Sequence, residues 1–269
     1  MFRVLGNRKV TPTAHEMIVE APEVARKAQA GQFALLMVDE HSERIPYTLA
    51  DWDPETGSVT FIVLEVGKST SDFVRLQPGD EVAHVTGPLG MPLEVENFGT
   101  VACIGGCYGL GGIVPVGRTM KAAGNRVITF VEARMEGMHY YLDKYESFSD
   151  EVVQTTTDGS NGIKGHGVDI LEARLKEGVQ VDRVFTIGCP FMMMLTAQVT
   201  QPYEIKTFAA LNPIMLDGTG MCGACRCTVG DETKFACVDG PFFDAHLVDW
   251  HELRDRRAAY IRIERDVCK

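Results

Sequence analysis

The sequence changes its pattern near Gly99, and this change constrains the fold more than any other feature. Before Gly99, short apolar runs are separated by turns rich in glycine and proline, whereas after it apolar runs alternate with segments of helical pattern. Closely spaced short strands are typical of an antiparallel barrel, and strand–helix alternation is typical of a parallel α/β sheet. We therefore expect an antiparallel β-barrel followed by an α/β domain with a parallel sheet.

Individual elements can be expected in both regions. In the first region the strands cover residues 33–38, 47–51, 58–66 and 81–85. Ser69, Thr70 and Ser71 are favourable N-cap residues, so a short helix is expected to follow them. In the second region the apolar runs cover residues 101–104, 127–132, 152–157, 184–187 and 205–209.

Composition excludes several classes of protein. The chain carries 26 Lys and Arg against 37 Asp and Glu, a net charge of −11, which argues against a nucleic-acid binder. No apolar signal segment follows Met1, and the longest uncharged stretch, residues 101–117, is glycine-rich and too short to span a bilayer, so no membrane insertion is expected. Eight cysteines in a chain of 269 residues favour metal or redox chemistry in a reducing cytoplasm over disulfides.

The clearest chemical motif lies between Asp217 and Cys237. Asp217, Cys222, Cys225 and Cys237 are spaced D-x4-C-x2-C-x11-C, which differs from the plant-type [2Fe-2S] spacing by an aspartate at the first position. A carboxylate can ligate iron, so we expect a [2Fe-2S] cluster on these four residues. Cys227 is the competing candidate for the aspartate position, and a structural zinc on the four cysteines from Cys222 to Cys237 is the alternative to a cluster.

A glycine-rich segment after the first apolar run of the second region predicts a nucleotide site. It contains Gly105, Gly106, Gly109 and Gly111 between a strand and a helix, the context in which backbone N–H groups meet a phosphate in a Rossmann-like domain. Tight packing of strand and helix without a nucleotide would also require glycine there.

An acidic residue ends the next apolar run. Glu132 is placed to bind a ribose 2′-OH, which favours NAD(H), whereas Arg134 would suit a 2′-phosphate. The remaining candidates for this site follow later apolar runs, and they are Asp158, Gly188, Cys189 and Pro190. Cys189 would lie near a nicotinamide ring or be a small buried hydrophobic residue, and Asp158 would lie in a substrate-side loop or in a plain turn.

Three segments together resemble a known family. The first two read RIPYT at 44–48 and GKST at 67–70, and the third reads LNPIMLDGTGMCGACR at 211–226. In the order barrel, nucleotide domain and cluster loop, the chain is similar to the FAD- and [2Fe-2S]-carrying electron-transfer subunits of the ferredoxin reductase-like family. With Asp217 in the first ligand position, the chain is similar to the branch containing sulfide dehydrogenase and the small subunit of NADH-dependent reduced ferredoxin:NADP⁺ oxidoreductase. The related dihydroorotate dehydrogenase electron-transfer subunits normally have cysteine at this position.

The resemblance implies a division into an FAD-binding β-barrel at 1–98, an NAD(P)-binding α/β domain at 99–210 and a [2Fe-2S] module at 211–269. It also implies an aromatic ring over the flavin and a helix N-terminus at the diphosphate. The expected FAD contacts are Ile45, Pro46, Tyr47, Thr48, Ile62, Val63, Leu64, Gly67, Lys68, Ser69 and Thr70. In this chain Arg44 lies one residue before the position of the arginine in the family's R-x-Y-[ST] motif.

The resemblance further implies an oxidoreductase subunit in which electrons pass between NAD(H), FAD and the cluster, to or from a larger flavoprotein or iron–sulfur subunit. Flavin-based bifurcation and exchange with ferredoxin fit the same branch. The cofactors carry the reaction, so no catalytic side chain is expected. Two alternatives stay open, a stand-alone ferredoxin:NAD(P)⁺ reductase and a regulatory subunit that binds nucleotide and cluster without turnover.

Overall fold

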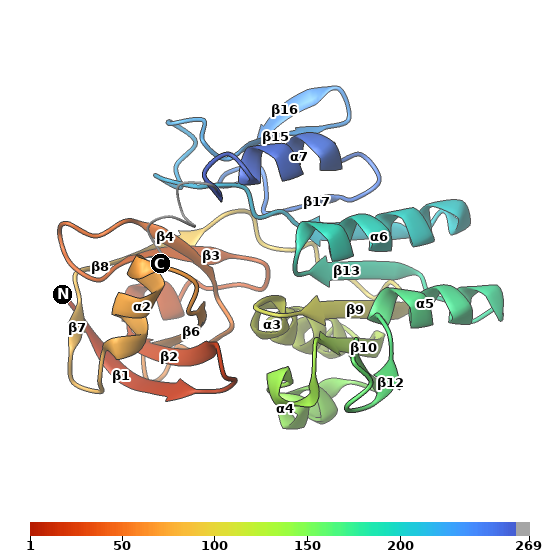
Figure 1. The fold of residues 1–269 in the computed structure, drawn as a ribbon, viewed down its shortest axis with the longest axis horizontal. Coiled ribbons are helices and arrows are strands. Elements are labelled where there is room, and N and C mark those ends of the chain that lie inside the picture. The colour runs from red at the N-terminus through yellow and green to blue at the C-terminus, as the bar shows by residue number, and fades with distance from the viewer. Residues whose placement is uncertain (262–269) are drawn as a thin grey trace. The chain divides into compact units, whose positions relative to one another are not determined.

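The computed structural model describes residues 1–261, and the chain divides into two compact units (Figure 1). The first unit contains residues 1–92, 212–241 and the described residues from 249 onward. The second contains residues 93–211 and 242–248. The chain therefore leaves the first unit and re-enters it twice. The division at 98 and 210 into three modules stays a prediction.

Strands β1 to β8 of the first unit form two antiparallel sheets, in the orders β5-β6-β2-β1-β7 and β4-β3-β8. Their bounds are β1 Phe2–Lys9, β2 Ala14–Glu20, β3 Phe33–Met37, β4 Ile45–Thr48, β5 Asp51–Asp53, β6 Ser58–Leu64, β7 Glu81–Val82 and β8 His84–Leu89. The helices here are α1 Pro22–Ala25 and α2 Lys68–Arg75. The expected strands are present, although 47–51 is divided between β4 and β5 and 81–85 between β7 and β8, and the structure adds β1, β2 and α1. The short helix is also present, but the expectation that it follows Ser69, Thr70 and Ser71 is wrong, because Gly67 is the N-cap and these three residues lie in the first turn of α2.

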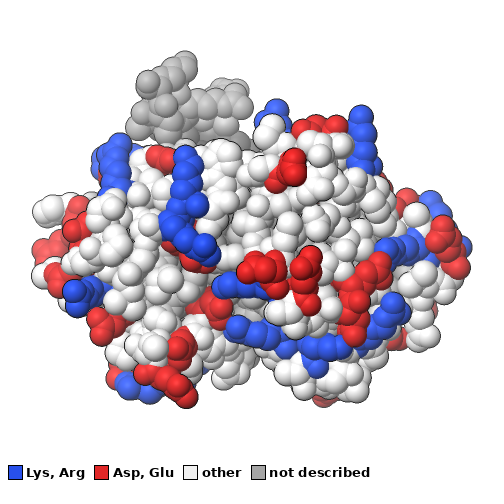
Figure 2. All heavy atoms as spheres, turned by 90° about the horizontal axis from the view of Figure 1, so that it is seen from below, with Lys and Arg blue, Asp and Glu red and all other residues white. Residues whose placement is uncertain are grey.

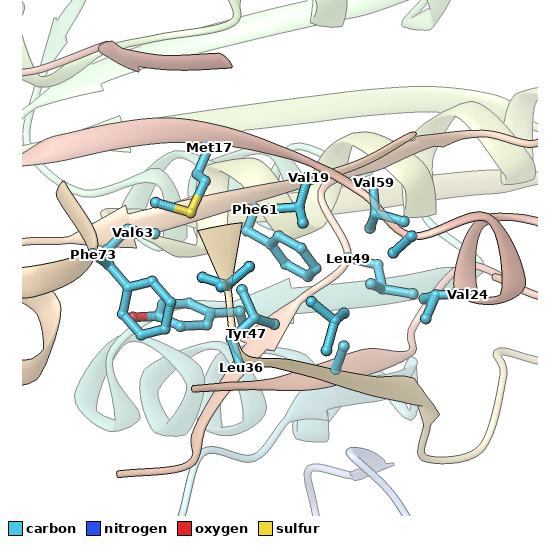
Figure 3. Packing of buried hydrophobic residues seen from close by; sticks show 14 of the residues in the cluster. Met17, Val19, Val24, Leu36, Tyr47, Leu49, Val59, Phe61, Val63 and Phe73 are labelled. Atoms are coloured by element: carbon cyan, nitrogen blue, oxygen red, sulfur yellow. The ribbon is translucent and has the colours of Figure 1, made fainter. Parts of the chain in front are cut away.

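The core between these two sheets is built from alternate residues of their strands (Figure 3). The Tyr47 ring packs edge-on against Phe73, with ring centroids 5.5 Å apart, and lies 6.2 Å from the ring of Phe61. Such aromatic contacts add to the stabilisation that burial of their apolar surface provides. This core holds β4, β6 and α2 in one cluster.

The second unit contains a sheet in the order β12-β11-β10-β9-β13-β14-β17, parallel except for β17. The strands are β9 Thr100–Gly106, β10 Arg126–Ala133, β11 Glu151–Thr156, β12 Ile163–Lys164, β13 Arg183–Ile187, β14 Lys206–Ala210 and β17 Phe242–Asp244. The helices are α3 Gly109–Ala122, α4 Leu142–Phe148, α5 Gly167–Lys176 and α6 Pro190–Thr200, with single 3₁₀ turns at Glu136–Met138 and Gln201–Tyr203. All five expected runs are strands, which confirms the parallel α/β domain.

The strand order places a topological switch point beside β9. This strand comes first in the unit, β10 pairs with one of its edges and β13 with the other. Ligands of open α/β sheets bind outside the carboxyl ends of the strands at such a point. The candidate nucleotide segment lies there, with Gly105 and Gly106 at the end of β9 and Gly109 and Gly111 in the first turn of α3.

The cysteine-rich segment returns to the first unit. After a loop, β15 Arg226–Val229 and β16 Glu232–Phe235 form a hairpin, and α7 Trp250–Arg257 packs on β15. Among residues 1–261, no helix is both long and apolar enough to cross a membrane. On the face shown in Figure 2, basic and acidic side chains are interspersed.

Candidate functional site

The loop after β14 is organised around the carboxylate of Asp217. Its Oδ1 atom accepts a hydrogen bond from the Thr219 N–H at 2.7 Å, and Oδ2 accepts one from the Cys222 N–H at 2.7 Å. Gly218 and Gly220 have φ values of +71° and +82°, a region that favours glycine. These contacts bring the first two predicted cluster ligands to one tight turn.

The other two predicted ligands meet in the interior of the same unit. Cys225 and Cys237 are both buried, and Cys225 is close enough to Cys237 to influence the pKa of its thiol. Burial, with a smaller contribution from Cys225, raises the pKa of Cys237 to about 12. As the side chains stand, no three His, Cys, Asp or Glu groups within residues 1–261 already surround a single metal position. The donor set of one carboxylate and three thiols nevertheless fits an iron–sulfur cluster chemically.

Cys227 has a different environment from its neighbours. It is buried on β15, and its thiol donates a hydrogen bond to the Lys234 carbonyl of β16, with sulfur and oxygen 3.7 Å apart. Burial raises the pKa of this thiol to about 12. The Cys227 thiol thus has a partner within the hairpin, as the Asp217 carboxylate has in its own loop. The assignment of Asp217 rather than Cys227 as the fourth ligand stays a prediction.

The cluster loop lies against the outer face of sheet β4-β3-β8. A Cβ atom on Gly218 would lie 2.8 Å from Leu35 Cδ1 and 2.9 Å from Leu89 Cδ1, so the loop backbone contacts these side chains directly. The Met91 N–H also donates to the Gly240 carbonyl at 2.6 Å. Loop and sheet are thus joined within one unit.

The same outer face carries part of the predicted flavin segment. In the antiparallel register, Pro46 lies opposite Leu35 and Thr48 opposite Phe33, and opposed residues share a face. Pro46 and Thr48 are half-buried, whereas Tyr47 points into the core. The face against which Gly218 packs therefore includes Pro46 and Thr48.

Alternation also separates the other predicted flavin contacts. Val63 belongs to the core together with Tyr47, and Ile45 packs against that core. Ile62 and Leu64 lie on the opposite face of β6 from Val63. Pro46 and Thr48 thus point away from the core on sheet β4-β3-β8, and Ile62 and Leu64 point away from it on the other sheet. The packing of Tyr47 in the core does not favour the predicted contact of its ring with the flavin.

The turn before α2 is closed by Thr70. Its Oγ1 accepts from the N–H groups of Val66 at 2.9 Å and Gly67 at 3.0 Å, and donates to the Gly67 carbonyl at 3.0 Å. Ser69 donates to the Glu43 carboxylate at 2.7 Å, and Lys68 pairs with Asp72 at 2.9 Å. The Thr70 hydroxyl thus shapes the turn, leaving the first N–H groups of the helix to face a ligand.

At the switch point, Gly109 meets the end of β13 at close range. A Cβ there would lie 2.0 Å from the Ile187 carbonyl oxygen. The Gly111 N–H donates to the Tyr140 hydroxyl at 3.0 Å, and that hydroxyl donates to the Cys107 carbonyl at 3.1 Å. Gly105 packs against Leu110 and Ile113, and Gly106 against Met192. Close strand–helix packing accounts for these glycines, and the nucleotide contact stays a prediction.

Glu132 has two protein partners. Its Oε1 lies 2.8 Å from His166 Nδ1, and its Oε2 accepts from the Gly167 N–H at 3.0 Å, at the N-terminus of α5. The hydrogen bond to Glu132 raises the pKa of His166. Arg134 is exposed nearby in sequence, and Asp158 accepts from the N–H and hydroxyl of Ser160 in a turn.

The last predicted segment caps α6. Cys189 is its N-cap, with Sγ accepting from the Met192 N–H at 3.5 Å, and Pro190 is the first helical residue, as expected. Gly188 accepts a hydrogen bond from the Tyr108 hydroxyl at 2.7 Å. The sequence reasoning did not find Tyr140, His166 or Tyr108, because no local pattern marks side chains that meet the site from other elements.

Comparison with known proteins agrees with these features. The profile of the iron–sulfur cluster binding domain of dihydroorotate dehydrogenase B matches residues 212–249. One similar solved structure is that of an NADH-dependent reduced ferredoxin-NADP oxidoreductase, which gives insights into flavin-based electron bifurcation. It matches with a TM-score of 0.93 and 36% sequence identity, and the match covers 100% of this chain and 96% of that chain. The fold is thus of the ferredoxin reductase-like class with a C-terminal iron–sulfur domain.

Two relatives by sequence specify the family. The dihydroorotate dehydrogenase B (NAD(+)) electron transfer subunit homolog of Thermotoga maritima is 39% identical over 252 residues, 94% of this chain and 89% of that protein. The corresponding electron transfer subunit of Bacillus caldolyticus is 30% identical over 251 residues, 90% of this chain and 95% of that protein. The chain belongs to the family of dihydroorotate dehydrogenase B electron-transfer subunits and their homologues.

Proposed function

We propose that this chain is the NAD(P)H-linked electron-transfer subunit of a larger oxidoreductase. FAD binds on the outer face of β4 and at the α2 turn, a [2Fe-2S] cluster binds to Asp217, Cys222, Cys225 and Cys237, and NAD(H) binds at the switch point beside β9. When bound, these groups supply hydride transfer between nicotinamide and flavin and one-electron transfer through the cluster.

The observation that carries this proposal is the shared face of sheet β4-β3-β8. Gly218 of the cluster loop rests on Leu35 and Leu89, and Pro46 lies opposite Leu35 in the register. The predicted flavin-side residue Pro46 and the cluster loop thus share one face of the sheet. The protein's part is to hold the two groups near each other and to set the polarity around them.

A larger partner follows from the two relatives described as electron transfer subunits. It would be a flavoprotein or iron–sulfur subunit that exchanges electrons through the cluster. The similarity to the NADH-dependent reduced ferredoxin-NADP oxidoreductase structure supports NAD(H) and ferredoxin as the electron donors or acceptors of the complex.

The test combines activity with composition. Anaerobically purified protein should contain one FAD and two irons per chain, and NADH should bleach an artificial dye. Isolation of the native complex should yield a larger companion chain. A chain that binds both groups without dye reduction would be a regulatory subunit, whereas full ferredoxin-linked turnover without a companion would identify a stand-alone reductase.

A further inference from the structure

Two cysteines follow the strands that flank the switch point of the second unit. The register of β9 and β13 pairs Val101 with Arg183 and Gly105 with Ile187, a constant offset of 82 residues. The same offset places Cys107 opposite Cys189, two residues beyond the last pair. Neighbouring strands lie about 4.8 Å apart, so the two backbones leave the sheet side by side.

Contacts around both residues keep the two segments close. The Tyr108 hydroxyl donates to the Gly188 carbonyl at 2.7 Å, linking the residue after Cys107 to the residue before Cys189. The close approach of Gly109 to Ile187 and Gly188 adds a second link. Both thiols are exposed. Burial of part of the side chain raises the pKa of Cys107, and the neighbouring Cys189 thiol adds to this rise.

Each cysteine also has an unusual local setting. Cys189 Sγ accepts from the Met192 N–H at the N-terminus of α6, where the helix dipole stabilises negative charge. Cys107 has a φ of +56°, a left-handed conformation in which glycine is the less strained residue. A thiol is thus held at a position where the backbone alone would favour glycine.

We propose that Cys107 and Cys189 form a dithiol that a hydroperoxide oxidises to an intramolecular disulfide across the switch point. The Cys189 thiolate attacks a peroxide oxygen, the O–O bond breaks, and a sulfenic acid and one water result. The Cys107 sulfur then attacks the sulfenic sulfur, the S–S bond forms, the S–O bond breaks, and a second water leaves. In total, two thiols and hydrogen peroxide give one disulfide and two waters.

The disulfide lies where the proposed function places NAD(H), so its effect on the nucleotide rests on that proposal. A covalent bridge between the two segments fixes the α3 and α6 N-termini relative to each other, at the ends of the strands where the nucleotide is proposed to bind. The reduced protein binds NADH, and the oxidised protein binds it at least tenfold more weakly. Reduction by a dithiol restores binding.

The bond itself is tested by peptide mapping of the holoprotein. After treatment with hydrogen peroxide, free thiols are blocked with N-ethylmaleimide in denaturant and the chain is digested with trypsin. Cys107 then lies in the peptide 76–118 together with Cys103, and Cys189 lies alone in the peptide 184–206. The expected product is a cross-link of these two peptides whose fragment ions assign it to Cys107. A link to Cys103, or oxidised Cys189 without a link, would overturn the proposal.

The effect on the nucleotide is measured by calorimetric titration with NADH. Peroxide should weaken binding to the wild type at least tenfold, and dithiothreitol should reverse the loss. The Cys107→Gly variant, whose backbone suits the left-handed φ, should bind NADH with or without peroxide, and it controls for damage to the cluster. Equal loss in the variant, or a cross-linked wild type that still binds NADH, would refute the switch. Reduced wild type that binds no NADH would instead refute the proposed function, while the peptide map still decides whether the disulfide forms.

Discussion

On strand β4, Pro46 and Tyr47 are adjacent in sequence but point to opposite faces of the sheet. Successive side chains of a strand alternate, so only every second residue of a motif can reach a ligand on one face. The Tyr47 side chain is buried in the barrel core, with its ring against Phe61 and Phe73 (Figure 3). The same rule separates Val63 from Ile62 and Leu64 on β6.

Substitution of Cys227 tests the ligand assignment at the scale of one residue. Cys227→Ser should retain two irons per chain and a rhombic EPR signal after reduction, because its thiol bonds the Lys234 carbonyl within the hairpin. Cys222→Ser should lose most of the iron, since it removes a proposed ligand. Iron analysis and EPR of both variants decide the matter. Loss of iron from the Cys227 variant would show that Cys227, and not Asp217, is the fourth ligand.

Nucleotide preference should depend on pH through Glu132 and His166. The pKa of His166 is raised above 6.5 by Glu132, so the imidazole is cationic at low pH and offsets the carboxylate. As pH rises through this pKa, the carboxylate charge stands alone and repels a 2′-phosphate. The ratio of kcat/KM for NADH to that for NADPH should therefore rise with pH, by a factor of up to about five, since half-exposed pairs are worth about 1 kcal/mol or less.

The matched control for this prediction is His166→Gln, which cannot gain the charge. The 2′-phosphate itself takes up a proton near pH 6, with a pKa of about 6 for such groups, so some pH dependence remains in any variant. Dye-reduction rates between pH 6 and 8.5 should show a smaller change in the ratio for His166→Gln than for the wild type. Identical profiles would exclude His166 from nucleotide selection.

At the scale of an element, helix α2 shows how one hydroxyl sets the geometry of an anion site. Thr70 satisfies the N–H groups that precede the helix and thereby fixes the direction in which the helix begins. Glu43 reaches the same turn through Ser69. The turn is thus held by contacts within the protein itself, and a diphosphate would meet a preformed helix N-terminus.

Removal of this hydroxyl should destabilise the first unit. Thr70→Ala should lower the free energy of unfolding by about 0.5–2 kcal/mol, the usual cost of losing a helix cap. It should also weaken FAD binding, because the N–H groups lose their fixed direction, and Thr70→Ser should restore both properties. Urea unfolding and FAD titration of deflavinated protein measure the two effects. A Thr70→Ala protein that unfolds like the wild type would contradict the capping role.

At the scale of the whole chain, the first unit is assembled from distant segments. Residues 212–241 return to it after the entire parallel sheet, and residues 242–248 leave it again so that β17 can pair with β14. The cluster loop is therefore stabilised by the barrel against which it packs. Its fit to Leu35 and Leu89 depends on the missing side chain of Gly218.

A paired substitution isolates this packing. Gly218 and Gly230 have similar φ values, +71° and +62°, but a Cβ on Gly230 meets nothing within 4 Å. Gly218→Ala should destabilise the protein by about 1–3 kcal/mol more than Gly230→Ala, because overpacking adds to the shared backbone strain, and it should lower iron content. Urea unfolding and iron analysis test this. Equal destabilisation by the two variants would mean that the loop does not rest on the barrel.

The sequence by itself determined the classes of element and the chemistry of the ligands. The five apolar runs after Gly99 became parallel strands, because burial on both faces demands continuous apolar residues whatever the rest of the chain does. The spacing from Asp217 to Cys237 marked the cluster loop, since ligand spacing is a local property. Pro190 likewise marked the first turn of α6, whereas the N-cap role of Cys189 came from the structure.

Only the tertiary structure decided which side chains meet. The hydrogen bond from Gly111 to Tyr140 joins residues 29 positions apart, and the pairing of Glu132 with His166 joins residues 34 positions apart. The direction of the Tyr47 side chain depends on which face of β4 the core covers. The return of residues 212–241 to the barrel has the same origin. Such contacts arise from packing between elements that are distant in sequence. A local sequence pattern does not predict them, because each partner would suit its own strand or turn equally well without the other.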